Sequence, residues 1–370
     1  MSMTDELLGG ESVGSLLGAL QDAAPGRRFE ATREAAAGLS ALTLSARARS
    51  LADAILRDVP GDHAELARVV RAATRGSGFE GWALWPVGLA SARRAVAEGT
   101  VSALDDSLEV LRELTKRFTS EFAIRPLLLH DLDRGLDRMA SWTADPDWRV
   151  RRLATEGSRP LLPWAERLPA LVADPSPTRA SLDALHDDAE ESVRRSVSNH
   201  VNDHSRGHAG FAVEVVRGWQ VRGGAHLGQV SRHALRTLVK RGDPAALELL
   251  GFPPALVSVS PLVVSPGRVE VGGAVEFGAV VENLGAESAP LVIDYVLLFP
   301  GARGEERSKV FKIAQRTLAP GERTQVRASH SFRPITTRRY YSGRYGVALQ
   351  VNGVPHPRTD FELGEADRGL

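Results

Sequence analysis

Similar sequence contexts surround three carboxylates: Glu121, Glu156 and Asp203. Each follows small or apolar residues and is close to a glycine, proline or polar residue that would end a helix. Read singly, each is an acid at the solvated end of a helix. If the helices repeat, however, their equivalent ends lie along one edge of a superhelix, and the acids converge. Carboxylates gathered in this way would stabilise positive charge that develops on a substrate.

Arginines accompany these acids. Arg152 precedes Glu156 by one helical turn, so an i, i+4 ion pair is expected. Arg159, Arg194 and Arg195 complete the basic cluster. These side chains either pair within their helices and pack their stems, or they form a row that follows a phosphate backbone along a groove.

One aromatic residue, Trp164, follows Glu156 by eight residues. The simplest interpretation is a tryptophan of the core. The alternative is an aromatic face beside the carboxylates. Such a face would suit a cationic ligand, because the face of the ring attracts positive charge.

The elements that carry these residues are predicted to be repeated helices. Apolar residues recur at helical spacing up to about residue 257. The segment Val150–Thr155 resembles Val193–Ser198, 43 residues further on, and Ser231–Arg236 is a looser third copy. A period of roughly 40–47 residues is typical of HEAT-type repeats, which stack helix pairs into a superhelix with a concave groove. A groove of this kind could also hold another protein.

The hydrophobic period becomes two after residue 257. Short alternating segments such as Val275–Val281 and Thr324–Arg327 are separated by turn pairs such as Pro266-Gly267 and Asn352-Gly353. About seven short strands in roughly 105 residues are typical of an immunoglobulin-like β-sandwich. The sequence therefore predicts a multidomain fold, α then β: an α-α superhelix of HEAT-like repeats over residues 1–257, followed by an immunoglobulin-like β-sandwich over residues 258–370.

The charge of the chain is balanced as a whole and unbalanced locally. The 370 residues include 46 basic and 46 acidic ones, which excludes a globally basic nucleic-acid binder. Residues 300–345, however, hold eleven basic residues against three acidic ones, an excess of eight. Arg338 and Arg339 lie there among tyrosines and hydroxyls and are candidate DNA contacts. The alternative is a set of solvated basic strand faces.

Several kinds of site are excluded or disfavoured. The absence of cysteine excludes disulfides and thiolate metal sites. No Walker, Rossmann, His-Glu-x-x-His or nucleophile-elbow motif is present. His200, His204 and His208 would share one helix face, but Ser205–Gly207 is expected to end that helix first. We therefore predict neither a metal nor a cofactor.

The sequence also bears on the compartment. It has no apolar run near the ~20 residues that a membrane helix needs and no basic, apolar leader at its N-terminus. We expect a cytoplasmic protein, associated with the nucleoid when bound to DNA, that does not enter the membrane.

These motifs together resemble a known family, the AlkC/AlkD superfamily of HEAT-like-repeat DNA glycosylases. The resemblance covers about residues 10–362. The segments that carry it are Thr155–Pro160 with Pro163-Trp164, Val193–His200 with Asn202-Asp203, Ser120–Pro126, and Arg333–Tyr341. The first and the last of these are the most specific. The last one and Ser120–Pro126 are similar to the AlkC branch, which carries a C-terminal immunoglobulin-like domain.

The resemblance implies a monofunctional glycosylase that hydrolyses the N-glycosidic bond of cationic N3-alkylated bases, 3-methyladenine and 3-methylcytosine, without flipping the base. By match, Glu121, Glu156 and Asp203 are the active-site acids, Trp164 faces the lesion, and Arg152 supports the site. The expected partner is double-stranded DNA with alkylated bases, bound by a monomer. Some relatives only bind unusual DNA, so the alternative is a non-catalytic binder of damaged or branched DNA. A HEAT-type protein scaffold is a third hypothesis.

Overall fold

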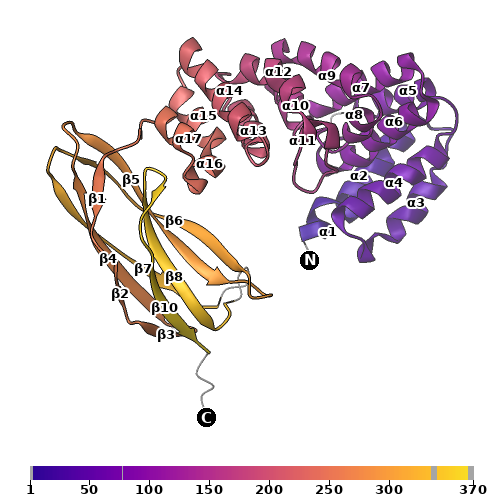
Figure 1. Cartoon of the computed structure of the whole chain (residues 1–370). Helices are drawn as coiled ribbons and strands as arrows, with labels where there is room; N and C mark the ends of the chain where they lie inside the picture. Colours follow the sequence, from indigo (N-terminus) through magenta and orange to yellow (C-terminus); the bar gives the residue numbers. More distant parts are fainter. Residues whose placement is uncertain (1–2, 77, 335–339, 366–370) are drawn as a thin grey trace. The chain divides into compact units, whose positions relative to one another are not determined.

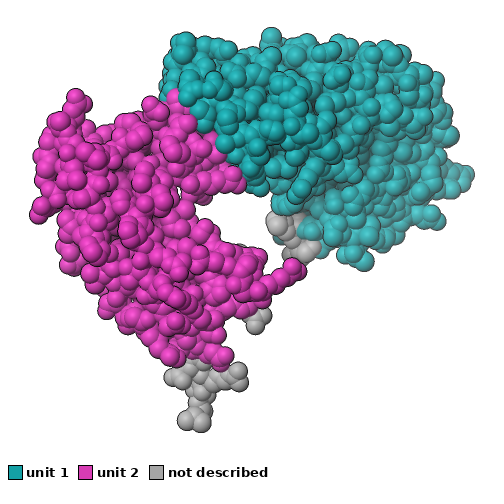
Figure 2. All heavy atoms as spheres, in the orientation of Figure 1, with its two compact units in different colours: residues 1–234 teal, residues 235–370 magenta. Residues whose placement is uncertain are grey.

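The computed structural model describes residues 3–76, 78–334 and 340–365 (Figure 1). The chain divides into two compact units, residues 1–234 and 235–370, shown in different colours in Figure 2. The helices of unit 1 are α1 (Met3–Leu7), α2 (Gly10–Ala23), α3 (Glu30–Ala37), α4 (Leu44–Asp58), α5 (His63–Ala73), α6 (Leu84–Glu98), α7 (Val101–Thr115), α8 (Arg125–His130), α9 (Leu132–Ser141), α10 (Trp148–Glu156), α11 (Pro169–Ala173), α12 (Arg179–Leu185), α13 (Glu191–His204), α14 (Ala209–Arg222) and α15 (Leu227–Ala234). Four short 3-10 turns, η1 (Leu39–Ala41), η2 (Gly81–Ala83), η3 (Trp142–Ala144) and η4 (Ser176–Thr178), are also among the described elements.

The repeated segments of the sequence become stacked helices. α10 packs against α13, and α13 packs against α15. Val150 and Leu153 of α10 are fully buried, as are Val193 and Val197 at the corresponding face of α13. Apolar residues three or four positions apart form one stripe of a helix, and each stripe is buried by the neighbouring repeat. The ends of α10 and α13 that carry the acids consequently come together.

Unit 2 holds two short helices and all the described strands. Its elements are α16 (Arg236–Arg241), α17 (Pro244–Leu249), β1 (Val257–Val259), β2 (Val263–Ser265), β3 (Arg268–Glu270), β4 (Ala274–Asn283), β5 (Ala289–Pro300), β6 (Glu306–Leu318), β7 (Arg323–Ser331), β8 (Gly343–Val351), β9 (Val354–Pro355) and β10 (Thr359–Gly364). In one sheet β4 pairs antiparallel with β1, β2 and β7. The other sheet has the order β3-β10-β8-β5-β6, in which β3 and β10 are parallel.

The inward faces of the two sheets form the core of unit 2. Buried aromatic residues from both sheets meet there, including Phe277 of β4, Tyr295 of β5 and Tyr345 of β8. Alternate residues of β4 and β7 are buried, which is the period of two that the sequence shows. The predicted fold class, helical repeats followed by a β-sandwich, is confirmed.

The boundary between the two units lies earlier in the chain than the sequence predicts. It falls after residue 234 rather than after residue 257. α16 and α17 belong to unit 2, because Gly242 after α16 approaches Gly353 of the sandwich so closely that a Cβ on Gly353 would lie 2.1 Å from the Gly242 carbonyl oxygen. Asn352 also donates a hydrogen bond to the carbonyl of Pro253 at 2.7 Å. The change from helix to strand nevertheless falls at Val257. The domain assignment 1–257 and 258–370 therefore stays a prediction.

No helix in the described part of the chain is long and apolar enough to cross a bilayer.

Candidate active site

A continuous chain of ion pairs brings the three predicted acids together. Arg152 Nη1 donates to Glu121 Oε2 at 2.8 Å, and Arg152 Nη2 lies 3.7 Å from Glu156 Oε1. Arg159 Nη1 donates to the same Glu156 oxygen at 2.7 Å. The Nε and Nη2 atoms of Arg159 then donate to the two oxygens of Asp203, at 2.9 and 3.3 Å. Acids and arginines thus alternate from one end of the cluster to the other.

Each acid lies where a helix ends or has just ended. Glu156 is the last residue of α10, and Asp203 is in the last turn of α13. Glu121 lies in the turn between α7 and α8. The i, i+4 pair that the spacing of Arg152 and Glu156 predicts is present, but the shorter contact of Arg152 is with Glu121.

The cluster is largely removed from water. The side chains of Glu121, Glu156 and Asp203 are 11%, 7% and 4% exposed, so each charge depends on its partners rather than on solvent. Burial raises the pKa of Asp203, although Arg159 opposes this shift. Burial also acts to lower the pKa of Arg159, but the carboxylates of Asp203 and Glu156 outweigh it and raise that pKa.

Two carboxylate oxygens of the cluster accept no hydrogen bond from the described residues. Both oxygens of Asp203 accept hydrogen bonds from Arg159. In contrast, Glu121 Oε1 and Glu156 Oε2 have no hydrogen bond with another residue in the part of the chain that the structure describes. These two oxygens could face a cationic centre or hold a water molecule.

Trp164 is not a core residue. Its side chain is 76% exposed, so the interpretation of a buried tryptophan is wrong. It follows Pro163 in a tight turn that the Ala165 amide closes by donating to the Leu162 carbonyl at 3.3 Å. The backbone φ of Trp164 is +64°, a left-handed conformation that glycine usually provides and that strains other residues. The chain thus holds an indole ring in solvent at a conformational cost.

Two residues of the site, Thr119 and Arg125, have no role predicted from the sequence. The Thr119 hydroxyl donates to Glu121 Oε2 at 2.8 Å, and Arg152 Nη1 lies 3.3 Å from the same hydroxyl oxygen. Arg125 is 1% exposed, and its guanidinium donates to main-chain carbonyls of the segment that follows α10. An arginine placed within the apolar stretch before Leu127 and Leu128 was the one signal for its burial.

The two arginines of the repeated Val-Arg-Arg motif have different positions. The first one holds the turn between the repeats: Arg151 pairs with Asp188 at 2.6 Å, and Arg194 donates to the Asp188 carbonyl at 2.6 Å. The second one differs between the two copies: Arg152 pairs with Glu121, and Arg195 is exposed.

The three candidate DNA contacts of the helical unit, Arg159, Arg194 and Arg195, differ in their exposure to solvent. Arg194 is buried, with its described bonds to carbonyls of its own turn, and Arg159 is buried between two acids. Their positions do not suit a phosphate contact, and we do not carry that role forward for them. Arg195 is exposed and keeps it.

The basic segment of the sandwich is partly neutralised by neighbouring acids. Arg307 pairs with Glu305 at 2.5 Å and Arg323 with Glu282 at 3.0 Å. Arg344 pairs with Asp360. Other members, such as Arg316 and Arg333, are exposed. Arg338 and Arg339 lie outside the described residues.

The three histidines do not form a metal site. α13 ends at His204, as the sequence suggested, and the rings of His200 and His204 are buried with their centroids 5.0 Å apart. His200 Nδ1 bonds the Thr155 carbonyl at 2.8 Å, while His208 Nε2 bonds the Val172 carbonyl. Among the described residues, no group of three or more histidines and carboxylates could hold a metal ion.

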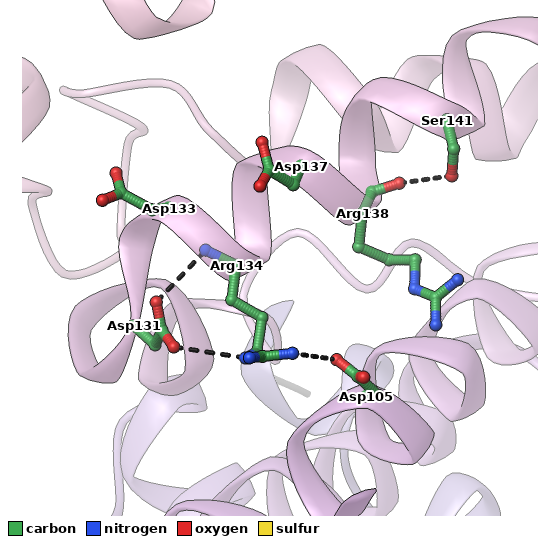
Figure 3. A pocket seen from close by; sticks show the side chains of 7 residues that line it. All are labelled: Asp105, Asp131, Asp133, Arg134, Asp137, Arg138 and Ser141. Carbon is green, nitrogen blue, oxygen red and sulfur yellow. Dashed lines mark hydrogen bonds and ion pairs between the residues drawn. The ribbon is translucent and has the colours of Figure 1, made fainter. Parts of the chain in front are cut away.

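A different hollow lies beside α9 (Figure 3). It is lined by Asp105, Asp131, Asp133, Arg134, Asp137, Arg138 and Ser141. Arg134 bridges Asp105 at 3.0 Å and Asp131 at 3.3 Å, as the dashed lines show. Four aspartates against two arginines leave this surface acidic. It would repel phosphate, so a path for a polyanion is expected elsewhere on the molecule.

Comparison with known proteins gives two relatives over most of the chain. The uncharacterised protein YhaZ of Bacillus subtilis (strain 168) is 32% identical over 324 residues, which cover 87% of this chain and 88% of YhaZ. The structure is similar to that of the Pseudomonas fluorescens alkylpurine DNA glycosylase AlkC bound to DNA containing an abasic site analogue, with a TM-score of 0.80 and 31% identity. That match covers 98% of this chain and 100% of AlkC. Residues 258–365 match the family described as the C-terminal Ig-like domain of the uncharacterised protein YhaZ.

The exposure of Trp164 leads to a prediction about stability. Trp164→Ala should change the free energy of unfolding by no more than about 0.5 kcal/mol, because the ring packs against little. Trp164→Gly should be at least as stable as the alanine variant, because glycine adopts a positive φ without strain. Urea unfolding would measure both values. The control is Trp142→Ala, which removes a ring that is 2% exposed and should cost about 3–5 kcal/mol. A comparable cost for Trp164→Ala would show that the ring is packed in solution.

The buried histidines lead to a prediction about pH. Burial lowers the pKa of His200 well below its usual value and that of His204 to about 4. The unfolded chain therefore binds protons that the folded chain does not bind, and stability should fall as the pH decreases from about 6.5 towards 4. In His204→Asn this fall should be smaller, by on the order of 2 kcal/mol at pH 4. The exposed His130 of α8 gives the control, because it is not among the groups that shift the pKa of His200 or His204, and His130→Asn should keep the pH dependence of the wild type. Equal pH dependence in all three proteins, measured by urea unfolding, would contradict this account.

Proposed function

The chain belongs to the AlkC branch of the AlkC/AlkD superfamily of HEAT-like-repeat DNA glycosylases, and we propose that it excises cationic N3-alkylated bases from double-stranded DNA. The substrates would be 3-methyladenine and 3-methylcytosine. The observation that carries the proposal is the buried chain of ion pairs that joins Glu121, Glu156 and Asp203. The DNA that was bound to AlkC supports DNA as the partner.

The reaction is hydrolysis of the N-glycosidic bond. Methylation at N3 makes the base cationic, and the base takes the electron pair of the breaking bond when it leaves as a neutral molecule. Positive charge moves to the deoxyribose, which gives an oxocarbenium-like transition state, as in glycoside hydrolysis. Water then adds to C1′ and loses a proton, and an abasic site remains.

The carboxylates act on the charge that develops. Negative oxygens in a water-poor site favour a carbocation far more than they would in bulk water. The available oxygens, Glu121 Oε1 and Glu156 Oε2, are the groups proposed to face the sugar or to orient the attacking water. Asp203 holds Arg159 and adds negative charge close by. A strong general acid is unnecessary, because the base already carries its positive charge.

Selectivity follows from the same charge. A neutral base gains little from the carboxylates and is a poor leaving group, whereas a methylated base meets both the acids and the face of the Trp164 ring. We propose that the exposed ring contacts the lesion while the base remains in the helix, without flipping. The cluster of Glu121, Arg152, Glu156, Arg159 and Asp203 contains no lysine, which supports monofunctional hydrolysis rather than Schiff-base chemistry.

Arginines outside the acid cluster would hold the DNA backbone. The exposed Arg195 of α13 is the candidate in the helical unit. In the second unit the candidates are Arg338 and Arg339, which lie in the basic segment of the sequence. Such contacts contribute affinity and its dependence on salt, and they carry no part of the chemistry.

The acids can be tested by isosteric substitution. Glu121→Gln, Glu156→Gln and Asp203→Asn should each lower single-turnover release of methylated base by about 10²-fold or more, because each removes a negative charge from the transition state. Binding to undamaged DNA should remain within a few fold of the wild type.

Glu191→Gln is the matched control, since it removes an exposed acid at the opposite end of α13. Circular dichroism would confirm that each variant is folded, which matters for Asp203→Asn because the buried Arg159 loses a partner. Unchanged rates for all three acid variants would remove them from the active site. Binding without any base release by the wild-type protein would favour the non-catalytic binder.

The salt dependence of binding tests the second unit. Replacing Arg338 and Arg339 together by glutamine should reduce the slope of log K against log salt by about 1.8, if each arginine neutralises one phosphate. Titrations of duplex DNA at several salt concentrations would measure the slope. Arg344→Gln is the control, because its partner Asp360 already neutralises Arg344. An identical slope for the double variant and the wild type would exclude these two phosphate contacts.

A further inference from the structure

Arg125 is a buried cation that has no role in the proposed reaction. It is the first residue of α8, and its side chain is 1% exposed. Its guanidinium donates four hydrogen bonds: Nε and Nη2 donate to the Glu166 carbonyl at 2.8 and 2.5 Å, and Nη1 donates to the carbonyls of Gly157 and Arg159 at 2.8 and 2.9 Å. All these acceptors belong to the main chain.

The acceptors of Arg125 share one segment, residues 157–166, which we call the tryptophan loop. It begins directly after Glu156 at the end of α10 and contains both Arg159 and Trp164. The start of the loop is bonded to α10: the amides of Gly157 and Arg159 donate to the carbonyls of Leu153 and Glu156 at 2.9 and 3.3 Å, and the Ser158 hydroxyl donates to the Ala154 carbonyl at 2.9 Å. The Leu168 amide donates to the Pro160 carbonyl at 3.3 Å, and the turn at Trp164 is closed by one further bond of 3.3 Å. Arg125 adds four bonds that tie the start of the loop, at Gly157 and Arg159, to its end at Glu166.

Burial and the neighbouring Arg159 lower the pKa of Arg125 to about 10, so the group remains charged at neutral pH. A guanidinium presents five donors in a rigid plane and reaches carbonyls on two sides at once. A lysine ammonium keeps the charge but has a single nitrogen, which cannot span the carbonyls of Gly157 and Glu166 in the same way. The arrangement thus requires the shape of arginine as well as its charge.

We propose that Arg125 is a positioning residue that holds the tryptophan loop in its active form before DNA arrives. By fixing both ends of the loop, it keeps Arg159 between Glu156 and Asp203 and keeps Trp164 in its strained, solvent-exposed conformation. Arg125 orders the loop in the free protein, whether or not DNA is bound. Its effect on catalysis rests on the proposed function, because there the ring and the acids meet the lesion. Preorganisation of this kind lowers the cost of ordering the site during binding and reaction.

The test compares Arg125→Lys and Arg125→Met in the full chain with a matched control. In the control Arg94→Met, an arginine that also donates to main-chain carbonyls, those of Leu56 and Val59, is removed from a different loop. Hydrogen exchange of the free proteins should rise at least tenfold in both Arg125 variants at the loop amides that donate hydrogen bonds, those of Gly157, Arg159 and Ala165. In Arg94→Met it should stay at the wild-type level there.

Activity provides the second readout. Single-turnover release of 3-methyladenine should fall at least tenfold in Arg125→Lys, while binding to undamaged duplex DNA changes less than twofold. In a Trp164→Ala background the same Arg125→Lys change should cost less than it does in the wild type, because the ring that Arg125 positions is already absent. A general loss of stability would not show this coupling.

Each outcome has a clear meaning. Wild-type exchange across residues 157–166 in Arg125→Lys, or in Arg125→Met, would overturn the proposal. Faster exchange with an unchanged excision rate would also overturn it, because loop order would then not matter for the reaction. If Arg125→Met does not fold, the hydrogen exchange and excision rate of Arg125→Lys alone test the proposal. If the wild-type protein releases no base, the proposed function fails, and the exchange data still decide whether Arg125 orders the loop.

Discussion

A charge that leaves water must find an opposite charge, and this constraint organises the helical unit around its acids. Three carboxylates and two arginines form one chain of ion pairs, and the buried Arg125 beside it adds a third positive charge. Pairing makes the burial of these charges tolerable. Under the proposed function, the positive charge that develops as the glycosidic bond of an alkylated nucleotide breaks would lie beside Glu121 and Glu156.

The repeat explains why these charges meet. The first arginine of each Val-Arg-Arg motif, Arg151 or Arg194, secures the turn at Asp188, and so it fixes the stacking of α10 on α13. This stacking places the ends of the two helices side by side. The second arginine differs between the two copies: Arg152 pairs with Glu121, whereas Arg195 is exposed. The first charge of the motif thus has the same structural role in both copies.

The loop after α10 keeps two features that cost stability. A positive φ and an exposed indole are both unfavourable for folding. They persist because Arg125 and the neighbouring turn determine the course of the main chain. An aromatic ring held in water has no role in the core, whereas it is well placed to contact a ligand.

The sequence by itself determined the order of the fold, because the hydrophobic period changes from helical spacing to two near residue 257. It also placed the acids at helix ends, since local spacing sets which face and which end a residue occupies. Tertiary structure alone decided that Arg159 bridges to Asp203, that Arg194 is buried and that Trp164 is exposed. These outcomes depend on which neighbouring repeat or loop covers a face, and that covering comes from residues tens of positions away, whose approach no local spacing encodes.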